Sequence, residues 1–591
     1  MPQLTKVLIA NRGEIAVRVA RACADAGIAS VAVYADDDRN ALHVRVADEA
    51  YSLGGVTAAE TYLDMHKLIS VAHRAGADAV HPGYGFLSES AGFAQAVIDA
   101  GLTWIGPSPS AIRTLGDKVS ARHVAAKVGA PLAAGTSDPV ANAEEIEAFA
   151  DAHGLPIVIK AAFGGGGRGL KVVERREDIP ELFDLAVREA TADFGRGECF
   201  VEQYLDRPRH VETQCLADSH GNVVVVSTRD CSLQRRHQKL VEEAPAPFIT
   251  KKQHDELVRA SKAILREAGY VGAGTCEFLL TRDGTISFLE VNTRLQVEHP
   301  VSEEVCGIDL VREQFRIAAG EELGYTSVEL SGHAFEFRLY AEDPVNFVPT
   351  PGTMTTLRLP GGPGVRLDFG YEPGDTMPSM FDSMIGKVIV WGIDRTEALA
   401  RARRALAEIL VVGVPTGLPF HRAVIKAPDF IAEDGHFGVH TRWIDTDFAE
   451  TLQSLSGGDP AADATDVSAS QMGRVVVEVG GKRLEIAIPA NLGALFPPRG
   501  ATPVAPRPRR TPSAQAAPKK GAGTVTAPMQ GVVVKVAAET GSTVAEGDLI
   551  VVIEAMKMEQ SIYAPNAGTI AGLTLEPGDR VTSGQTICTV K

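Results

Sequence analysis

Cysteines and long apolar runs are scarce in this sequence of 591 residues. The seven cysteines are odd in number and lack paired spacing, which argues against a disulfide framework and a zinc site. No apolar run approaches the roughly 18 residues that a membrane span needs. The N-terminus enters an apolar stretch without the basic region or cleavage site of a signal peptide, so we expect a cytoplasmic protein. A net charge of −17 disfavours nucleic acid and anionic membranes as main partners.

Two common nucleotide-binding patterns are also missing. A predicted strand at Lys6–Ala10, a helix at Glu14–Ala26 and a strand at Ala29–Tyr34 form a βαβ unit, which indicates an α/β fold with a parallel sheet. The turn Asn11–Glu14 lacks G-x-G-x-x-G, so a nicotinamide or flavin cofactor has little support. The glycine-rich run Gly164–Gly169 does not match the Walker pattern either.

That glycine-rich run nevertheless favours phosphate binding. It follows the apolar strand Ile157–Lys160, and its backbone N–H groups are free to surround phosphate oxygens beside the cations Lys160 and Arg168. A flexible linker is the alternative interpretation. Because predicted strands flank the run on both sides, we expect a phosphate-binding loop of a different kind.

Two acidic segments flank Asp283-Gly284, a favoured two-residue hairpin turn. In that register Glu277 lies opposite Glu290, and like charges in this position destabilise a sheet unless something neutralises them. Asn292 shares the face of Glu290, so the set offers only oxygen ligands, which suits Mg²⁺ (or Mn²⁺) bridging to ATP phosphates. The alternative is that nearby arginines neutralise both carboxylates.

Polar residues are concentrated around this hairpin in a way that a plain core would not tolerate. Arg294, Gln296 and Glu298 continue the alternation of the second strand, which His299-Pro300 is expected to end. A basic run, Gln234–Lys239, precedes two glutamates. The alternating segment Phe335–Tyr340 places Glu336 and Arg338 on one face.

The C-terminal region contains an internal repeat with an offset of 37 residues. Ala527-Pro528, Gly531, Gly541, Val544 and Gly547 recur as Ala564-Pro565, Gly568, Gly578, Val581 and Gly584. Such self-similarity indicates a repeated supersecondary unit, here of short strands between glycine and proline turns. Lys557 lies between Met556 and Met558 where the halves meet, and would otherwise be an ordinary solvated lysine.

Residues 524–591 resemble the biotinyl domain of biotin-dependent carboxylases, in which the lysine of Ala-Met-Lys-Met carries biotin. The related lipoyl domain is the second possibility, but methionines on both sides of the lysine favour biotin. The resemblance implies biotin attached to Lys557 on a small all-β carrier domain, a flattened barrel or sandwich.

Residues 1–447 resemble biotin carboxylase, an ATP-grasp ligase, through four separated motifs: the glycine-rich run, Gln234–Lys239, Glu290–Pro300 and Asp382–Lys387. The resemblance implies an N-terminal α/β subdomain at 1–117, an ATP-grasp domain at 118–320 with a mobile lid at about 133–204, and a C-terminal subdomain at 321–447.

The same resemblance implies roles for individual residues. The ATP-binding residues would be Lys118, Lys160, Gly165, Gly166, Gly167, Glu202, Leu205, His210, Gln234 and His237. The metal ligands would be Glu277, Glu290 and Asn292. The catalytic residues would be Glu298, Arg338, Arg294 and Lys239, and bicarbonate and biotin would bind at Arg294, Gln296, Val297 and Arg338.

The segments between the enzyme and the carrier are of another kind. Residues 448–496 contain a polar spacer and a hairpin pattern at Val475–Ile488 with Gly480-Gly481 at its tip, which suggests a small interaction element. Residues 497–523 are rich in proline and alanine. A largely extended tether of this length would reach about 80 Å.

The sequence therefore predicts the biotin carboxylase and carrier parts of an acyl-CoA carboxylase α subunit. The expected partners are a separate carboxyltransferase β subunit in a large symmetric complex, an additional small subunit and biotin protein ligase. The expected products are malonyl-CoA or methylmalonyl-CoA. The alternatives are another ATP-grasp ligase joining a carboxylate to an amine, and a non-catalytic carrier or scaffold.

Overall fold

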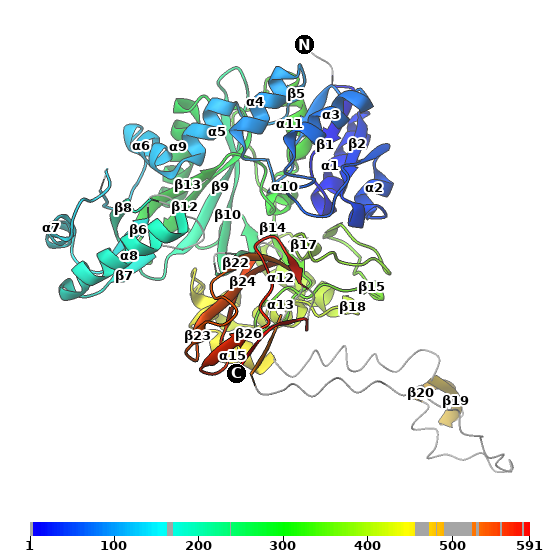
Figure 1. Cartoon of the computed structure of the whole chain (residues 1–591). Helices are drawn as coiled ribbons and strands as arrows, with labels where there is room; N and C mark the ends of the chain where they lie inside the picture. The colour runs from blue at the N-terminus through cyan, green and yellow to red at the C-terminus, as the bar shows by residue number, and fades with distance from the viewer. Residues whose placement is uncertain are drawn as a thin grey trace, which may run out of the picture. The chain divides into compact units, whose positions relative to one another are not determined.

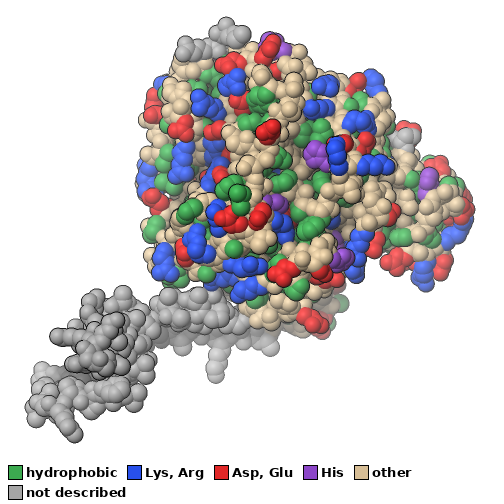
Figure 2. All heavy atoms as spheres, turned by 180° about the vertical axis from the view of Figure 1, so that it is seen from behind, with side chains coloured by type: hydrophobic (Ala, Val, Ile, Leu, Met, Phe, Trp, Pro, Cys, Tyr) green, Lys and Arg blue, Asp and Glu red, His purple; other side chains and the backbone are tan. Residues whose placement is uncertain are grey.

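The computed structural model describes residues 4–136, 138–161, 170–194, 196–236, 238–455, 472–479, 482–489, 523–527, 531–555, 558–581 and 584–591. The chain forms two compact units, Met1–Ser456 and Gly457–Lys591 (Figure 1). Within the described ranges, no helix is both long and apolar enough to cross a membrane. On the face shown in Figure 2, acidic and basic side chains are interspersed.

The first unit begins with a parallel five-stranded sheet in the order β3-β2-β1-β4-β5. Its strands are β1 (Lys6–Ile9), β2 (Ala29–Tyr34), β3 (Glu49–Ser52), β4 (Ala79–His81) and β5 (Thr103–Trp104). The predicted βαβ unit is confirmed, because α1 (Gly13–Ala26) connects the parallel strands β1 and β2. The other elements here are η1 (Asp36–Asp38), α2 (Leu42–Val46), α3 (Met65–Ala75), α4 (Ala91–Asp99) and α5 (Pro109–Gly116).

An antiparallel eight-stranded sheet forms the centre of the unit, in the order β13-β12-β9-β10-β11-β14-β17-β16 (Figure 1). Its strands are β9 (Arg209–Ala217), β10 (Val223–Arg235), β11 (Gln238–Ala244), β12 (Gly272–Leu280), β13 (Ile286–Asn292), β14 (His333–Tyr340), β16 (Val365–Phe369) and β17 (Met384–Gly392). All eight residues of β14 are buried, so other parts of the protein cover both faces of this strand. This sheet joins the predicted ATP-grasp and C-terminal regions into one structure.

A smaller antiparallel sheet, β7-β6-β8, lies within the segment proposed as a lid. It contains β6 (Ile157–Ala161), β7 (Leu170–Val173) and β8 (Cys199–Gln203), with α7 (Ala143–His153), η2 (Arg176–Asp178) and α8 (Ile179–Phe194). These elements have their own apolar core, which includes Ile146, Ile157, Ile159, Val173 and Val201. The segment can therefore behave as a small body of its own.

The remaining elements of the first unit surround the large sheet. They are α6 (Lys118–Lys127), α9 (Lys251–Glu267), α10 (His299–Cys306), α11 (Leu310–Ala318), β15 (Thr356–Arg358), α12 (Arg395–Glu408), β18 (Leu410–Val412), α13 (Leu418–Val424), α14 (Pro428–Ile431), η3 (Trp443–Asp445) and α15 (Ala449–Ser454).

In the second unit, the sequence repeat produces two four-stranded sheets with equivalent strand orders, β21-β28-β26-β23 and β25-β24-β22-β27. The strands are β21 (Thr524–Thr526), β22 (Gly531–Val536), β23 (Thr543–Val544), β24 (Leu549–Ala555), β25 (Met558–Tyr563), β26 (Gly568–Ala571), β27 (Arg580–Val581) and β28 (Thr586–Val590). A shift of 37 residues maps one order onto the other. The predicted repeat of short antiparallel strands is therefore confirmed.

The hairpin expected around Lys557 is present as far as it is described. β24 ends at Ala555, β25 begins at Met558, and these two residues pair. Met556 and Lys557 lie outside the described residues. The second predicted hairpin is also confirmed, as β19 (Met472–Val479) pairs with β20 (Lys482–Pro489), although its expected tip, Gly480-Gly481, is likewise outside the described part.

Candidate active site

Cross-strand pairing in the large sheet brings charged residues together. Glu277 on β12 lies opposite Glu290 on β13 and opposite Glu212 on β9. On the other side of β9, Glu212 pairs with Arg229 of β10. The predicted opposition of Glu277 and Glu290 is confirmed, and the sheet extends the charged row by two further residues.

The turn that leads to this pairing differs from the predicted one. Thr281 N–H donates to the Thr285 carbonyl, so the loop has three residues rather than two, and Gly284 adopts a φ of 91°. This loop moves the register by one residue, and a bulge at Leu289 moves it back before Glu290. The prediction of a two-residue turn was wrong, and the pairing is right because the two offsets cancel.

The second strand is shorter than predicted. β13 ends at Asn292, so the expectation that its alternation continues to Glu298 was wrong. The carbonyl of Gln296 accepts the N–H of His299 and contacts its ring Nδ1 at 2.7 Å, which closes a turn at the start of α10. This turn, rather than strand alternation, directs residues 294–298 into the site.

Lys239 of β11 lies at the centre of the site. Its Nζ donates to Glu212 (2.6 Å), Glu277 (2.9 Å) and Glu298 (2.6 Å). Burial lowers the pKa of Lys239, but the three carboxylates outweigh it and hold that pKa well above the usual value. A single ammonium therefore neutralises glutamates from two strands and from the turn before α10.

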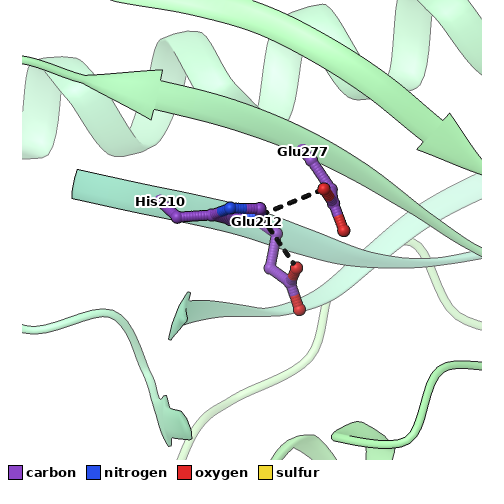
Figure 3. A group of neighbouring side chains, drawn as sticks. All are labelled: His210, Glu212 and Glu277. Atoms are coloured by element: carbon purple, nitrogen blue, oxygen red, sulfur yellow. Dashed lines mark ion pairs between the residues drawn. The ribbon is translucent and has the colours of Figure 1, made fainter. Parts of the chain in front are cut away.

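His210 completes this group from the same strand as Glu212 (Figure 3). Its Nε2 lies 3.1 Å from Glu277 and 3.5 Å from Glu212. Burial opposes the charged imidazolium, yet Glu277 dominates and the pKa of His210 rises to about 9. The cations beside Glu277 are thus a lysine and a histidine, so the alternative of neutralising arginines does not apply to that carboxylate.

Arg338 and Glu298 meet beside this cluster. Arg338 Nη2 donates to Glu298 (2.9 Å), while Arg338 Nε donates to Glu242 (2.6 Å). Burial raises the pKa of Glu298, but Lys239 and then Arg338 lower it to about 2. Glu298 is therefore a carboxylate held between two cations.

The other residues predicted to bind bicarbonate or biotin also reach this place. Arg294 donates to Asn292 Oδ1 (3.1 Å), and Gln296 donates to Glu277 (2.8 Å). The carbonyl of Val297 accepts Lys387 Nζ (2.8 Å). Each of the three residues has a defined partner in or next to the site.

The predicted nucleotide-binding residues that the structure describes lie in three places: the central cluster, the sheet of β6 and β8, and a cavity that Lys118 lines. Gln234 lies 3.5 Å from His210 in the central cluster. Lys160 donates to Glu202 across β6 and β8, and Leu205 follows β8. Gly165, Gly166, Gly167 and His237 lie outside the described residues.

Glu290 does not join the central cluster. Its carboxylate lies 3.4 Å from Lys118 Nζ, and both residues line a cavity of about 480 Å³ together with Asn292. Asn292 also donates to Glu277 Oε1 (2.8 Å), so it connects the cavity with the central cluster.

Sequence reasoning missed Glu212, Arg229 and Glu242. Arg229 is fully buried and donates to Glu212, Gln214, Thr275, Gln296 and Ser302. The alternation from His210 to Glu212 was a usable signal, because it places both side chains on one face. Arg229 and Glu242 gave no comparable local signal, since their partners come from distant strands.

The donor set fits the expected metal. Glu277, Glu290 and Asn292 offer oxygen atoms, the ligands that Mg²⁺ prefers. The carboxylates of Glu277 and Glu290 and the amide oxygen of Asn292 contact Lys239, Lys118 and Arg294, and a divalent ion would take the place of these cations beside the oxygens.

Four family models match the chain. Residues 3–112 match the biotin carboxylase N-terminal domain, 117–326 the ATP-binding domain of the carbamoyl-phosphate synthase L chain, 336–446 the biotin carboxylase C-terminal domain, and 523–590 the biotin-requiring enzyme domain. A biotin-dependent acyl-coenzyme A carboxylase alpha3 subunit of Mycobacterium leprae is 57% identical over 100% of this chain and 99% of its own. The chain belongs to the biotin-dependent carboxylase family.

Further relatives agree with this assignment. The α subunit of mitochondrial methylcrotonoyl-CoA carboxylase from Oryza sativa is 36% identical, covering 99% of this chain and 94% of its own. A crystal structure of a Campylobacter jejuni biotin carboxylase complex is 40% identical with a TM-score of 0.71, covering 75% of this chain and 99% of its own. A biotin carboxylase domain from Hydrogenobacter thermophilus, solved with MgADP and bicarbonate, is 41% identical with a TM-score of 0.70, covering 75% and 98%.

The family assignment confirms the expected fold class, an ATP-grasp biotin carboxylase followed by a β-rich biotinyl domain. It also confirms the expected cofactors, which are biotin, ATP and Mg²⁺. The chain is a ligase with biotin carboxylase activity.

Proposed function

We propose that the chain carboxylates biotin attached to its own Lys557, using ATP and bicarbonate, as the α subunit of an acyl-CoA carboxylase. The observation that carries this proposal is the placement of Glu298 between Lys239 and Arg338, beside the acidic row of the large sheet. This arrangement combines a carboxylate base with cations suited to bicarbonate and phosphate.

In the first step, Lys118 and Lys160 bind the ATP phosphates, together with Gly165, Gly166 and Gly167. Glu202, Leu205, His210, Gln234 and His237 contact the rest of the nucleotide. Glu277, Glu290 and Asn292 hold Mg²⁺, which neutralises charge on the phosphates when it is bound.

Glu298 then removes the proton of bicarbonate, held by Lys239, Arg294, Gln296 and Val297. An oxygen of bicarbonate forms a bond to the γ-phosphorus as the bond to ADP breaks, giving carboxyphosphate. With a pKa of about 2, Glu298 is ionised but a weak base. Bicarbonate and phosphate oxygens that engage Lys239 weaken its hold on Glu298, which raises this pKa toward a more effective value.

Carboxyphosphate breaks its C–O bond to release CO₂ and phosphate. When attached, biotin would supply a ureido nitrogen for the new bond to CO₂, and the proton of that nitrogen would pass to the phosphate. Arg338 stabilises the negative charge that develops on the ureido oxygen. Closure of the proposed lid at 133–204 excludes water during these steps.

The carboxyl group then passes to an acyl-CoA on a separate carboxyltransferase β subunit, giving malonyl-CoA or methylmalonyl-CoA from acetyl-CoA or propionyl-CoA. The Mycobacterium leprae and rice relatives are α subunits, which supports a separate partner. The β subunit would be arranged symmetrically, so that several carriers serve several sites.

The test is ATP hydrolysis by the purified chain, with Mg²⁺, in the presence and absence of bicarbonate. We expect ADP release to depend on bicarbonate and label from ¹⁴C-bicarbonate to appear on the biotinylated chain. A carboxylate–amine ligase would hydrolyse ATP without regard to bicarbonate, and a non-catalytic scaffold would release no ADP. Either result would contradict the proposal.

A further inference from the structure

Glu242 and Glu243 are adjacent buried residues of β11 whose side chains leave the strand on opposite faces. Each carboxylate holds one arginine. Glu242 accepts Arg338 Nε at 2.6 Å, and Glu243 accepts Arg395 at 2.7 and 3.1 Å. Arg338 is part of the candidate active site, whereas Arg395 lies among phenylalanine rings on the other side of the strand. Glu243 also lies 2.7 Å from His333 Nε2, so the two glutamates match in burial and in binding an arginine but not in every contact.

Arg338 has two carboxylate partners with different tasks. Glu298 bonds its Nη2 but also accepts Lys239, and it is the proposed base. When Glu298 gains the proton of bicarbonate, it loses its negative charge, and its charge-assisted hydrogen bond to Arg338 weakens. Glu242 is then the carboxylate that still holds the guanidinium.

The surroundings of Glu242 offer its carboxylate few other partners, which makes the hydrogen bond to Arg338 more important. Among the described residues, Arg338 is the one hydrogen-bond partner of the Glu242 side chain, and Glu242 Oε2 has none. Glu336 lies directly opposite on β14, and both of its carboxylate oxygens are buried without a hydrogen bond to any residue that the structure describes. Buried carboxylates are costly unless a cation compensates them, so Glu242 and Arg338 are strongly tied to each other.

We propose that Glu242 is a positioning residue that keeps Arg338 directed at the ureido oxygen of biotin while Glu298 changes its charge. This inference rests on the proposed function, because it requires Glu298 to act on bicarbonate. Without Glu242, carboxyphosphate still forms and breaks down, but CO₂ escapes before it bonds to biotin. Glu242 therefore couples ATP cleavage to carboxylation.

The experiment measures the ratio of carboxylated biotin to ADP in a single turnover of the full biotinylated chain, with ATP, Mg²⁺ and ¹⁴C-bicarbonate. We expect Glu242→Gln to retain bicarbonate-dependent ADP release and to lower this ratio on the order of tenfold to a hundredfold, because the substitution removes the negative charge that strengthens this hydrogen bond to Arg338. The matched control, Glu243→Gln, should unfold at a lower denaturant concentration yet keep the wild-type ratio.

The outcomes separate this inference from the proposed function. Wild-type protein that releases no ADP with bicarbonate would overturn the proposed function itself. An unchanged ratio in Glu242→Gln, or an equal loss in Glu243→Gln, would overturn only the positioning role. If Glu242→Gln yields no folded protein, Glu242→Asp keeps the charge but draws the carboxylate back, and the same fall in ratio is expected of it.

Discussion

At the scale of single residues, the site depends on charges that are buried together. Glu212, Glu277 and Glu298 all bond one ammonium, Lys239. Removal of one partner from such a buried group leaves an uncompensated charge, which typically costs about 3–5 kcal/mol. The stability of a variant at any of these residues must therefore be measured together with its activity before a loss of turnover is assigned to catalysis.

Glu14 offers a test of buried charge away from the chemistry. It is 5% exposed, its carboxylate has no hydrogen bond among the described residues, and Lys387 Nζ lies 3.3 Å away. Burial, only partly offset by Lys387, raises the pKa of Glu14 to about 7 from 4.5. The folded protein therefore binds this proton more tightly than the unfolded chain does.

The resulting stabilisation is complete below the unfolded pKa and is lost as pH rises through about 7. Because glutamine does not titrate, the stability of wild type relative to Glu14→Gln should fall by about 2–3 kcal/mol between about pH 5 and about pH 8. Urea unfolding of both proteins at about pH 5 and about pH 8 measures this change. Asp25→Asn, an exposed change on the same helix, should give the wild-type pH dependence; a parallel curve for Glu14→Gln would refute the prediction.

At the scale of secondary-structure elements, local patterns were sufficient where partners are close in sequence. The βαβ start and the carrier repeat could be predicted, because turns and alternation determine them within about 40 residues. The acidic pairing was also predicted, but only because the longer loop and the bulge at Leu289 offset each other. Glu212 and Arg229 could not be placed as readily, since they meet Gln296 and Lys239 only through pairing of distant strands. The end of β13 was mispredicted because a helix start competes with strand alternation.

Arg122 of α6 connects two segments of the proposed lid. Its Nη1 donates to Glu202 (3.0 Å) and its Nη2 to the carbonyl of Ala133 (2.8 Å), so one side chain joins the incoming and outgoing chains of the lid. Gly135 leaves the necessary room, since a Cβ there would lie 2.5 Å from Arg122 Nη2. Loss of this guanidinium should loosen the lid and misplace Glu202.

We expect Arg122→Met to raise the KM for ATP several-fold, about three- to tenfold, in a steady-state assay, because Glu202 loses one of its two basic partners. Arg259→Met is the control, as Arg259 bonds the carbonyl of Gly129 just before the lid and pairs with Glu256 without touching the lid. An unchanged KM in Arg122→Met would mean that the contact has no part in nucleotide binding.

At the scale of the whole molecule, the sizes of the domains indicate which half of the reaction this chain carries out. The segment between the carboxylase-like residues and the tether, 448–496, has only about 50 residues. A domain that binds CoA thioesters needs roughly 100–150 residues. The chain should therefore carboxylate its own biotin and still require a partner for transfer.

The purified chain, given ATP, bicarbonate and either acetyl-CoA or propionyl-CoA, should form no malonyl-CoA or methylmalonyl-CoA, as mass spectrometry of the acyl-CoA pool can show. Addition of a carboxyltransferase β subunit should restore product formation, with the β subunit determining which acyl-CoA is used. Product from the isolated chain would assign a catalytic role to the region of β19 and β20.

The contacts of Lys387 can form only late in the synthesis of the protein. This fully buried residue of β17 fixes the carbonyl of Val297 and faces Glu14, so parts of the chain that emerge from the ribosome early, midway and late meet at one ammonium. Until β17 has been made and docked, the segment that carries Gln296 and Glu298 lacks this anchor. The segment that carries Gln296 and Glu298 therefore becomes fully anchored only after β17 has been synthesised.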